Sequence, residues 1–127
     1  MPRADSRQTL GIAGEELACR ELSRRGYAIL ARRYRSRFGE IDIVAEDRGT
    51  TVFVEVKART TTLFGAAVEA VPPWKRRRIE AMALDYLRRT GRSHTACRFD
   101  VVAIDDAGSV RPVVRVIENA FAAGNGW

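Results

Sequence analysis

The segment from Val52 to Lys57, which reads VFVEVK, limits the possible folds more than any other part of the chain. Its apolar content is that of a central strand with both faces buried. Because side chains alternate along a strand, Phe53, Glu55 and Lys57 share one face. A carboxylate and an ammonium in such a setting must be paired, bound to a metal ion or open to a site. The segment therefore predicts a buried strand that carries a functional site.

A second acid interrupts the preceding apolar segment, where Asp42 lies between Ile41 and Ile43. Strands at 40–45 and 51–57 are joined by a polar run that predicts a hairpin turn. Antiparallel hairpin strands bring Asp42 and Glu55 side by side, where the two carboxylates repel each other unless a divalent cation binds both. We therefore expect the two carboxylates within about 5 Å of each other, as ligands of one cation.

Hydrophobic periodicity predicts an α/β fold in the order α-β-β-β-α-β-β, with a mixed sheet and helices packed on it. The 127 residues suffice for one domain, expected at 1–119, followed by a flexible tail at 120–127. Gly26 stands where a C-cap glycine ends the first helix, and Pro72 and Pro73 open the second. The expected helices span 9–25 and 72–89, and the expected strands 27–34, 40–45, 51–57, 98–104 and 110–117.

The two helices have predicted apolar faces. The inward stripe of the first includes Glu15, because Glu15, Ala18, Cys19 and Leu22 follow helical spacing. A site role for Glu15 is favoured over a pairing with an arginine at the edge of the core, and Glu16 is expected to pair with Arg20. The predicted apolar face of the second helix consists of Trp74, Ile79, Met82, Ala83, Tyr86 and Leu87.

The composition of the basic residues is unusual. The net charge is +6, which favours a polyanionic partner such as nucleic acid. Of the 22 basic residues, only Lys57 and Lys75 are lysine. A position that keeps lysine in an arginine-rich chain indicates a need for a compact ammonium, although chance is the alternative.

Arginine clusters predict where DNA binds. We expect contact with the duplex backbone, rather than a merely solvated face, and the second cluster opens a helix whose N–H groups also favour phosphate. No run of aromatic residues predicts base stacking, so sequence specificity is not expected. The predicted DNA-binding residues are Arg32, Arg33, Arg35, Arg37, Lys75, Arg76, Arg77 and Arg78.

Aspartate followed about a dozen residues later by Glu-x-Lys at the end of a strand is the signature of metal-dependent nucleases. Asp42 and Glu55 would hold Mg²⁺ or Mn²⁺, with the Val56 carbonyl as a third ligand. Such a cation polarises the scissile phosphate and acidifies a water, and Lys57 would orient or deprotonate that water. Glu40 and Asp100 are accessory candidates with Lys75, although a structural pair with Arg98 is favoured for Asp100.

The chain resembles the YraN family of uncharacterised bacterial proteins over residues 11–104. That family is similar to the PD-(D/E)XK nucleases, close in pattern to archaeal Holliday-junction resolvases, although Ile41 replaces the proline of the signature. The resemblance implies a restriction-endonuclease-like fold and assigns the catalytic roles to Glu15, Asp42, Glu55 and Lys57. The residues that carry it are Gly14-Glu15, Gly26-Tyr27, Gly39-Glu40-Ile41-Asp42, Phe53-Val54-Glu55-Val56-Lys57-Ala58-Arg59, Phe64-Gly65, Lys75 and Arg98-Phe99-Asp100.

These patterns predict a cytoplasmic phosphodiesterase that acts on DNA, with branched or processed structures as expected substrates. Rival functions are a nucleic-acid-binding module without turnover and a subunit of a DNA-processing assembly. A homodimer or a DNA-processing partner is therefore considered, and no membrane association is expected, since no apolar run could span a bilayer. Reduced thiols are expected at Cys19 and Cys97, and His94 is expected in a solvated loop.

Overall fold

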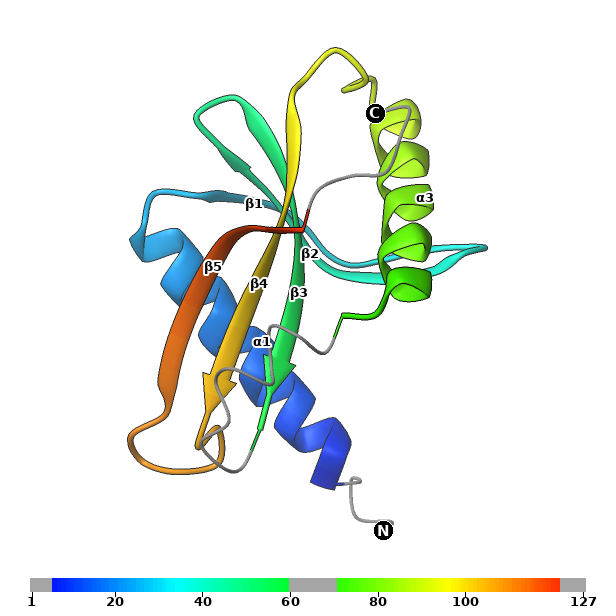
Figure 1. The fold of residues 1–127 in the computed structure, drawn as a ribbon. Coiled ribbons are helices and arrows are strands. Elements are labelled where there is room, and N and C mark those ends of the chain that lie inside the picture. Colours follow the sequence, from blue (N-terminus) through cyan, green and yellow to red (C-terminus); the bar gives the residue numbers. More distant parts are fainter. Residues whose placement is uncertain (1–5, 60–70, 122–127) are drawn as a thin grey trace, which may run out of the picture.

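The computed structural model describes residues 6–59 and 71–121, and these form an α/β fold (Figure 1). The predicted order of helix, three strands, helix and two strands is confirmed. Most of the loop predicted between 58 and 71 lies outside the described residues. The elements are α1 (Ser6–Arg24), β1 (Ala28–Ser36), β2 (Gly39–Asp47), β3 (Thr50–Ala58), α3 (Pro73–Arg89), β4 (Cys97–Asp105) and β5 (Val113–Phe121).

Five strands of the described chain form one mixed sheet in the order β1-β2-β3-β4-β5. Only β3 and β4 are parallel, and α3 lies between them in the sequence, as a parallel crossover requires. The β2–β3 hairpin turns through Arg48 and Gly49, which both have positive φ, of 51° and 85°. This is the backbone of a two-residue turn that matches the twist of its strands.

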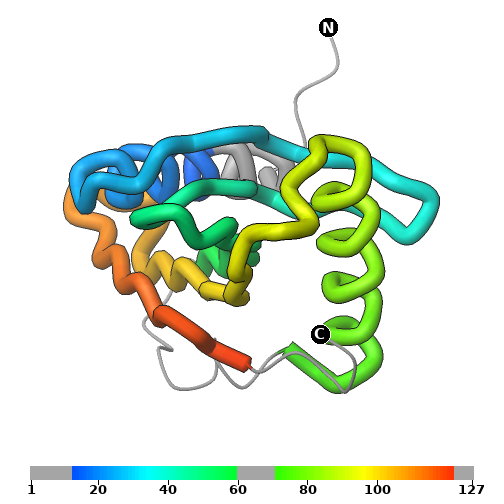
Figure 2. The backbone as a smooth tube through the Cα atoms, turned by 90° about the horizontal axis from the view of Figure 1, so that it is seen from above, coloured from blue at the N-terminus to red at the C-terminus, as the bar shows by residue number. Residues whose placement is uncertain are grey.

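Each face of the sheet carries its own hydrophobic core, and the alternation of β3 divides its side chains between the two. Val52 and Val54 pack with Ala18 and Leu22 of α1. Phe53 packs on the opposite face with Ile79, Met82 and Tyr86 of α3. The two helices therefore cover opposite faces, as the view from above shows (Figure 2). The face of Phe53 is also the one that carries Glu55 and Lys57.

Glycine is needed at one position within α1 and at one position just after its end. Gly26 ends the helix with a φ of 94°, and the Tyr27 N–H donates to the Leu22 carbonyl, which confirms the predicted C-cap. Gly14 lies where α1 crosses β3, and a Cβ added to it would come within 2.8 Å of the Ala58 Cβ. Since Ala58 Cβ is fixed to its backbone, α1 approaches β3 closely only because residue 14 has no side chain.

Gly14→Ala is expected to destabilise the fold by about 1–3 kcal/mol, the usual cost of overpacking, although alanine is the better helix former. Urea denaturation of the wild type and variant measures the difference. Gly14→Ala combined with Ala58→Gly should recover part of the loss, because the second change removes the opposing carbon. Gly108→Ala is the control, since a Cβ there meets nothing within 4 Å. Wild-type stability of Gly14→Ala would contradict the close crossing.

The predicted place of Trp74 on the apolar face of α3 is wrong, because its side chain is 55% exposed. The buried stripe consists of Ile79, Met82, Ala83, Tyr86 and Leu87. Trp74 lies five residues before Ile79, which at 3.6 residues per turn places it about 140° around the helix from the stripe. A large aromatic side chain is therefore left on the surface at the start of α3.

The C-terminal strand is displaced from its predicted position. β5 runs from Val113 to Phe121 instead of 110–117, and Val110 is exposed. Its end is held by Phe121, whose ring stacks on Phe99 at 5.0 Å between centroids. Residues 120 and 121, predicted to begin the tail, therefore belong to the sheet, and 122–127 lie outside the described residues.

Three smaller expectations concern the cysteines, the histidine and membrane association. Cys19 and Cys97 are both free thiols, and burial raises the pKa of Cys19. His94 is exposed in the turn between α3 and β4, as expected. Neither helix in residues 6–59 and 71–121 combines the length and apolar character needed to cross a membrane.

Candidate functional site

The candidate site lies where β2 leaves β3. Pairing of these strands runs from Asp47–Thr50 to Ile43–Val54 and ends there in the described residues. Beyond that point β2 continues into the β1–β2 hairpin beside α3, while β3 continues in another direction (Figure 1). Asp42 and Glu55 are the residues that follow the last pair on each strand, so both stand at the point of divergence.

The Asp42 carboxylate lies beside the backbone of β3. Its Oδ2 accepts a hydrogen bond of 2.8 Å from the Val56 N–H, in place of a bond between the two backbones. Burial and then the nearby charge of Glu55 raise the pKa of Asp42 to about 7, and Glu15 adds to the effect. Asp42 is therefore a partly buried acid whose negative charge lacks sufficient compensation, which is the property expected of a cation ligand.

Glu55 contacts the only two lysines of the chain. Its Oε1 lies 2.5 Å from the Lys75 Nζ and 3.5 Å from the Lys57 Nζ. Lys57 comes from the same strand, whereas Lys75 comes from the first turns of α3. These four residues, Asp42, Glu55, Lys57 and Lys75, are called the acid–lysine site below. Both lysines of this arginine-rich chain therefore lie at the same site.

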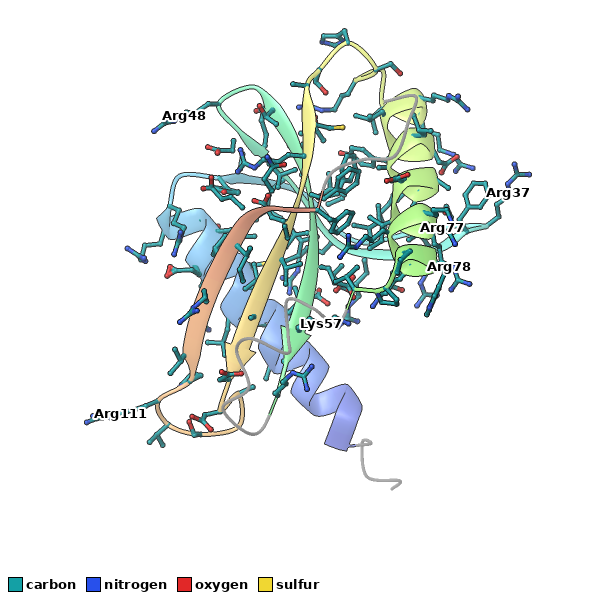
Figure 3. The ribbon with its side chains drawn as sticks, in the orientation of Figure 1. Arg37, Arg48, Lys57, Arg77, Arg78 and Arg111 are labelled. Carbon is teal, nitrogen blue, oxygen red and sulfur yellow. The ribbon has the colours of Figure 1, made fainter. Side chains whose placement is uncertain are left out.

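The two lysines differ in their electrostatics. Burial, followed by the neighbouring Lys75, lowers the pKa of Lys57. For Lys75 burial is the largest single effect and acts in the same direction, but the hydrogen bonds to Glu55 and Lys57 and the negative charges of Glu55 and Asp42 together raise the pKa. Lys75 therefore neutralises Glu55, while Lys57 is the ammonium that gives up its proton more readily. Figure 3 shows Lys57 near the end of β3.

Glu15 is buried on α1 and ion-paired with two arginines of β1. Its carboxylate lies 3.3 Å from the Arg32 Nε and 3.0 Å from the Arg33 Nε. Arg33 reaches it from a backbone with a φ of 52°, at an irregular point of β1. The pairing with core-edge arginines is thus present, and the influence of Glu15 on the pKa of Asp42 also places it near the site. Glu16 pairs with Arg32 at 2.8 Å, whereas a pair with Arg20 was predicted.

The donor set suits a hard cation only in part. Two acids at the same place and the raised pKa of Asp42 favour a divalent ion, which would relieve both charges. Within the described residues, no three Asp, Glu, His or Cys side chains gather as a metal cluster. A cation would therefore be held by Asp42 and Glu55, with the backbone at Val56 and water completing its shell. Lys75 would have to share Glu55 with it.

The predicted DNA-binding residues differ in the partners that they have within the chain. Arg32 and Arg33 are engaged by Glu15, and Arg76 donates from Nε to the Val71 carbonyl at 2.8 Å. Arg35 pairs with Glu40 at 3.0 Å on the surface, which makes Glu40 a partner of an exposed arginine. Arg37, Arg77 and Arg78 project outward at the same end of the molecule (Figure 3).

Asp100 belongs to a separate polar network. It is fully buried, and its Oδ1 lies 3.1 Å from the Arg98 Nε and accepts the Asn119 N–H at 2.9 Å. Arg98 also donates to the Tyr27 hydroxyl and pairs with Asp47. The favoured structural pair of Arg98 with Asp100 is confirmed. The network ties β4 to β5 and to the end of α1.

Sequence reasoning missed two features of the site region. One is that the Val56 N–H holds Asp42, which no sequence signal reveals because it depends on how the strands diverge. The other is the exposure of Trp74 and Phe38, whose rings lie against the guanidinium groups of Arg78 and Arg37. For Trp74, its angular distance from the stripe of α3 would have been a usable signal.

Comparisons with known proteins give a consistent result. The sequence model of the uncharacterised protein family UPF0102 matches residues 14–104. A UPF0102 protein of Symbiobacterium thermophilum is 46% identical over 114 residues, covering 90% of this chain and 97% of the relative. One of Geobacter sulfurreducens is 46% identical over 112 residues, or 88% of each chain. One of Ralstonia pickettii is 50% identical over 101 residues, or 76% of this chain and 81% of the relative.

Proposed function

This chain belongs to the uncharacterised protein family UPF0102, and we propose from its acid–lysine site that it is a metal-dependent nuclease of the PD-(D/E)XK type. Its reaction is the hydrolysis of DNA phosphodiester bonds. The observation that carries the proposal is the placement of Lys57 and Glu55 beside the partly buried acid Asp42, at the point where two strands diverge. Two adjoining carboxylates and a lysine suit phosphodiester hydrolysis, because the carboxylates can hold a metal ion and the lysine can orient a water.

Asp42 and Glu55 would hold Mg²⁺ or Mn²⁺, which supplies Lewis-acid polarisation of the scissile phosphate. Lys57 lies 3.5 Å from Glu55, in position to orient the attacking water and to take its proton. The lowered pKa of Lys57 supports this role, because a lysine accepts a proton only after losing its own. Lys75 compensates Glu55 until substrate and cation bind. The surface arginines would contact the phosphates on either side.

A second function is favoured by one observation. The Lys75 ammonium forms an ion pair with Glu55 and supplies the positive charge that a bound cation would otherwise supply. A chain in which that ion pair is permanent would bind nucleic acid without cleaving it, either alone or within a DNA-processing assembly. Catalysis requires that the Glu55 carboxylate bind the cation as well as, or instead of, the Lys75 ammonium.

A cleavage screen distinguishes the two functions. Flap, four-way-junction, single-stranded and linear duplex DNAs are incubated with the protein in Mg²⁺, Mn²⁺ or EDTA. Cleavage is expected with Mg²⁺ or Mn²⁺ and not in EDTA, and Glu55→Gln should lower the rate by about 10² or more, since it removes a ligand charge. Glu46→Gln is the control, because Glu46 pairs with Arg92 at the far end of β2.

The outcome separates enzyme from binding module. Cleavage that persists in EDTA, or that is the same in Glu55→Gln as in the wild type, would assign it to a contaminating nuclease. Binding of DNA without cleavage of any substrate in either metal would favour the non-catalytic module.

A further inference from the structure

Two exposed aromatic rings lie beside the proposed nuclease site, and each has an arginine over it. Trp74 is 55% exposed and Phe38 is 37% exposed. The Arg78 Cζ lies 5.3 Å from the centre of the Trp74 ring, and the Arg37 Cζ lies 4.9 Å from that of Phe38. These four residues are called the arginine–aromatic surface below.

The two halves of this surface are adjacent although they come from distant segments. Phe38 and Arg37 belong to the tip of the β1–β2 hairpin, and Trp74 and Arg78 to the first turns of α3. A Cβ added to Gly39 would lie 3.5 Å from the Arg78 Cδ, so the hairpin tip contacts the arginine that covers Trp74. Figures 1 and 2 both show the tip beside α3.

The surface is also connected to the acid–lysine site. Trp74 precedes Lys75, whose ammonium lies on Glu55. Arg77 adds a further outward charge on the same helix, as Figure 3 shows. Negative phosphates are therefore attracted to the surface that carries the rings, one residue along the chain from Lys75 of the acid–lysine site.

The chemistry of this surface fits an unpaired strand better than a duplex. Contact with a neighbouring guanidinium restricts the motion of each ring, and the exposed part of the ring can still stack on a planar partner. Unpaired bases can stack on such rings while arginines hold the phosphates between them. The bases of a duplex are stacked on one another, so a duplex can use only the arginines.

We propose that the arginine–aromatic surface binds unpaired nucleotides of a DNA strand, by stacking on Phe38 and Trp74. The inference rests on the proposed nuclease function, for which it names the substrate class: DNA with a single-stranded segment next to the scissile bond. Flaps and other branched structures supply such a segment, whereas linear duplexes do not.

The test measures binding in EDTA, where nothing is cleaved. A labelled unpaired strand of about 15 nucleotides is compared with the duplex of the same sequence. Trp74→Ala and Phe38→Ala should each weaken binding of the single strand by about tenfold, the usual loss for one stacked base, and binding of the duplex by less than about twofold. Trp74→Phe should restore most of the affinity, since it keeps an aromatic ring.

Two controls isolate stacking. Leu84→Ala removes an exposed apolar side chain of α3 outside this surface and should leave both affinities unchanged. In a Trp127→Phe background all tryptophan fluorescence comes from Trp74, because the chain has two tryptophans. Under excitation selective for tryptophan over tyrosine, this emission should be quenched by the single strand.

Equal losses for single strand and duplex, or unquenched Trp74 emission, would overturn the inference. Its failure is distinct from failure of the proposed function, because the binding assay contains no metal and the cleavage screen contains no surface variant. Selective binding without cleavage would retain the inference and reject the nuclease.

Discussion

Lys57→Arg is expected to abolish DNA cleavage while leaving DNA affinity nearly unchanged. The substitution keeps the positive charge, so long-range attraction to phosphate persists. A guanidinium is broader than an ammonium and stays protonated, so it cannot take a proton from the attacking water. The site is also crowded, since Lys57 and Lys75 meet at one oxygen of Glu55. The rate should fall by at least the ~10² typical of a lost catalytic group.

The measurement pairs cleavage of a flap or junction in Mg²⁺ or Mn²⁺ with binding in EDTA. Arg111→Lys is the matched control, because it makes the reverse change at an exposed residue between β4 and β5, away from the acid–lysine site (Figure 3). Its cleavage rate should equal that of the wild type. A Lys57→Arg variant that cleaves as fast as the wild type would show that the residue supplies charge alone.

Asp42→Asn is expected to stabilise the metal-free protein above neutral pH. The pKa of Asp42 is raised to about 7 from an ordinary value of 3.8, so the folded state binds this proton more tightly than the unfolded state. Stability contributed by the protonated acid is present below pH 4 and is lost as the pH rises to about 7. Asparagine carries no charge, and its amide oxygen can still accept the Val56 N–H.

The variant should therefore exceed the wild type by about 2 kcal/mol at pH 8, a discounted value of the ~1.4 kcal/mol per pKa unit, and by little at pH 4. Urea denaturation in EDTA across this range measures the difference. Glu40→Gln is the control, since an exposed ion pair contributes under about 1 kcal/mol. A difference in stability between Asp42→Asn and wild type that stays constant with pH would contradict the raised pKa of this partly buried carboxyl.

The same variant tests the cation without reference to cleavage. At pH 8, millimolar Mn²⁺ or Mg²⁺ should raise the melting temperature of the wild type, because a ligand that binds only the folded state stabilises it. Asp42→Asn should lose this response, since one of the two carboxylates is gone. An equal metal response in both proteins would place the bound cation elsewhere.

Much of the fold and part of the site follow from local patterns in the sequence. The order of helices and strands and the common face of Glu55 and Lys57 follow from hydrophobic periods of 3.6 and 2 residues. The Gly26 cap follows from residue type at the end of a helix. These signals all depend on residues close together in the sequence. The rarity of lysine also singled out Lys57 and Lys75. The placement of Trp74 is wrong because the prediction extended the apolar stripe of α3 to the start of the helix, whereas the buried stripe begins at Ile79.

The partners of the charged residues were decided by the tertiary structure. Arg32 and Arg33, predicted to bind DNA, also pair with Glu15, and the positive φ of Arg33 interrupts the strand alternation that would send two consecutive side chains to opposite faces. Lys75 reaches Glu55 because α3 packs on the face of the sheet that carries it. The divergence of β2 from β3 lets Asp42 accept the Val56 N–H. Residue types and the faces of individual helices and strands can thus be predicted from the sequence. Ion-pair partners depend on how distant elements cross, and hydrophobic periodicity within one segment carries no information about that crossing.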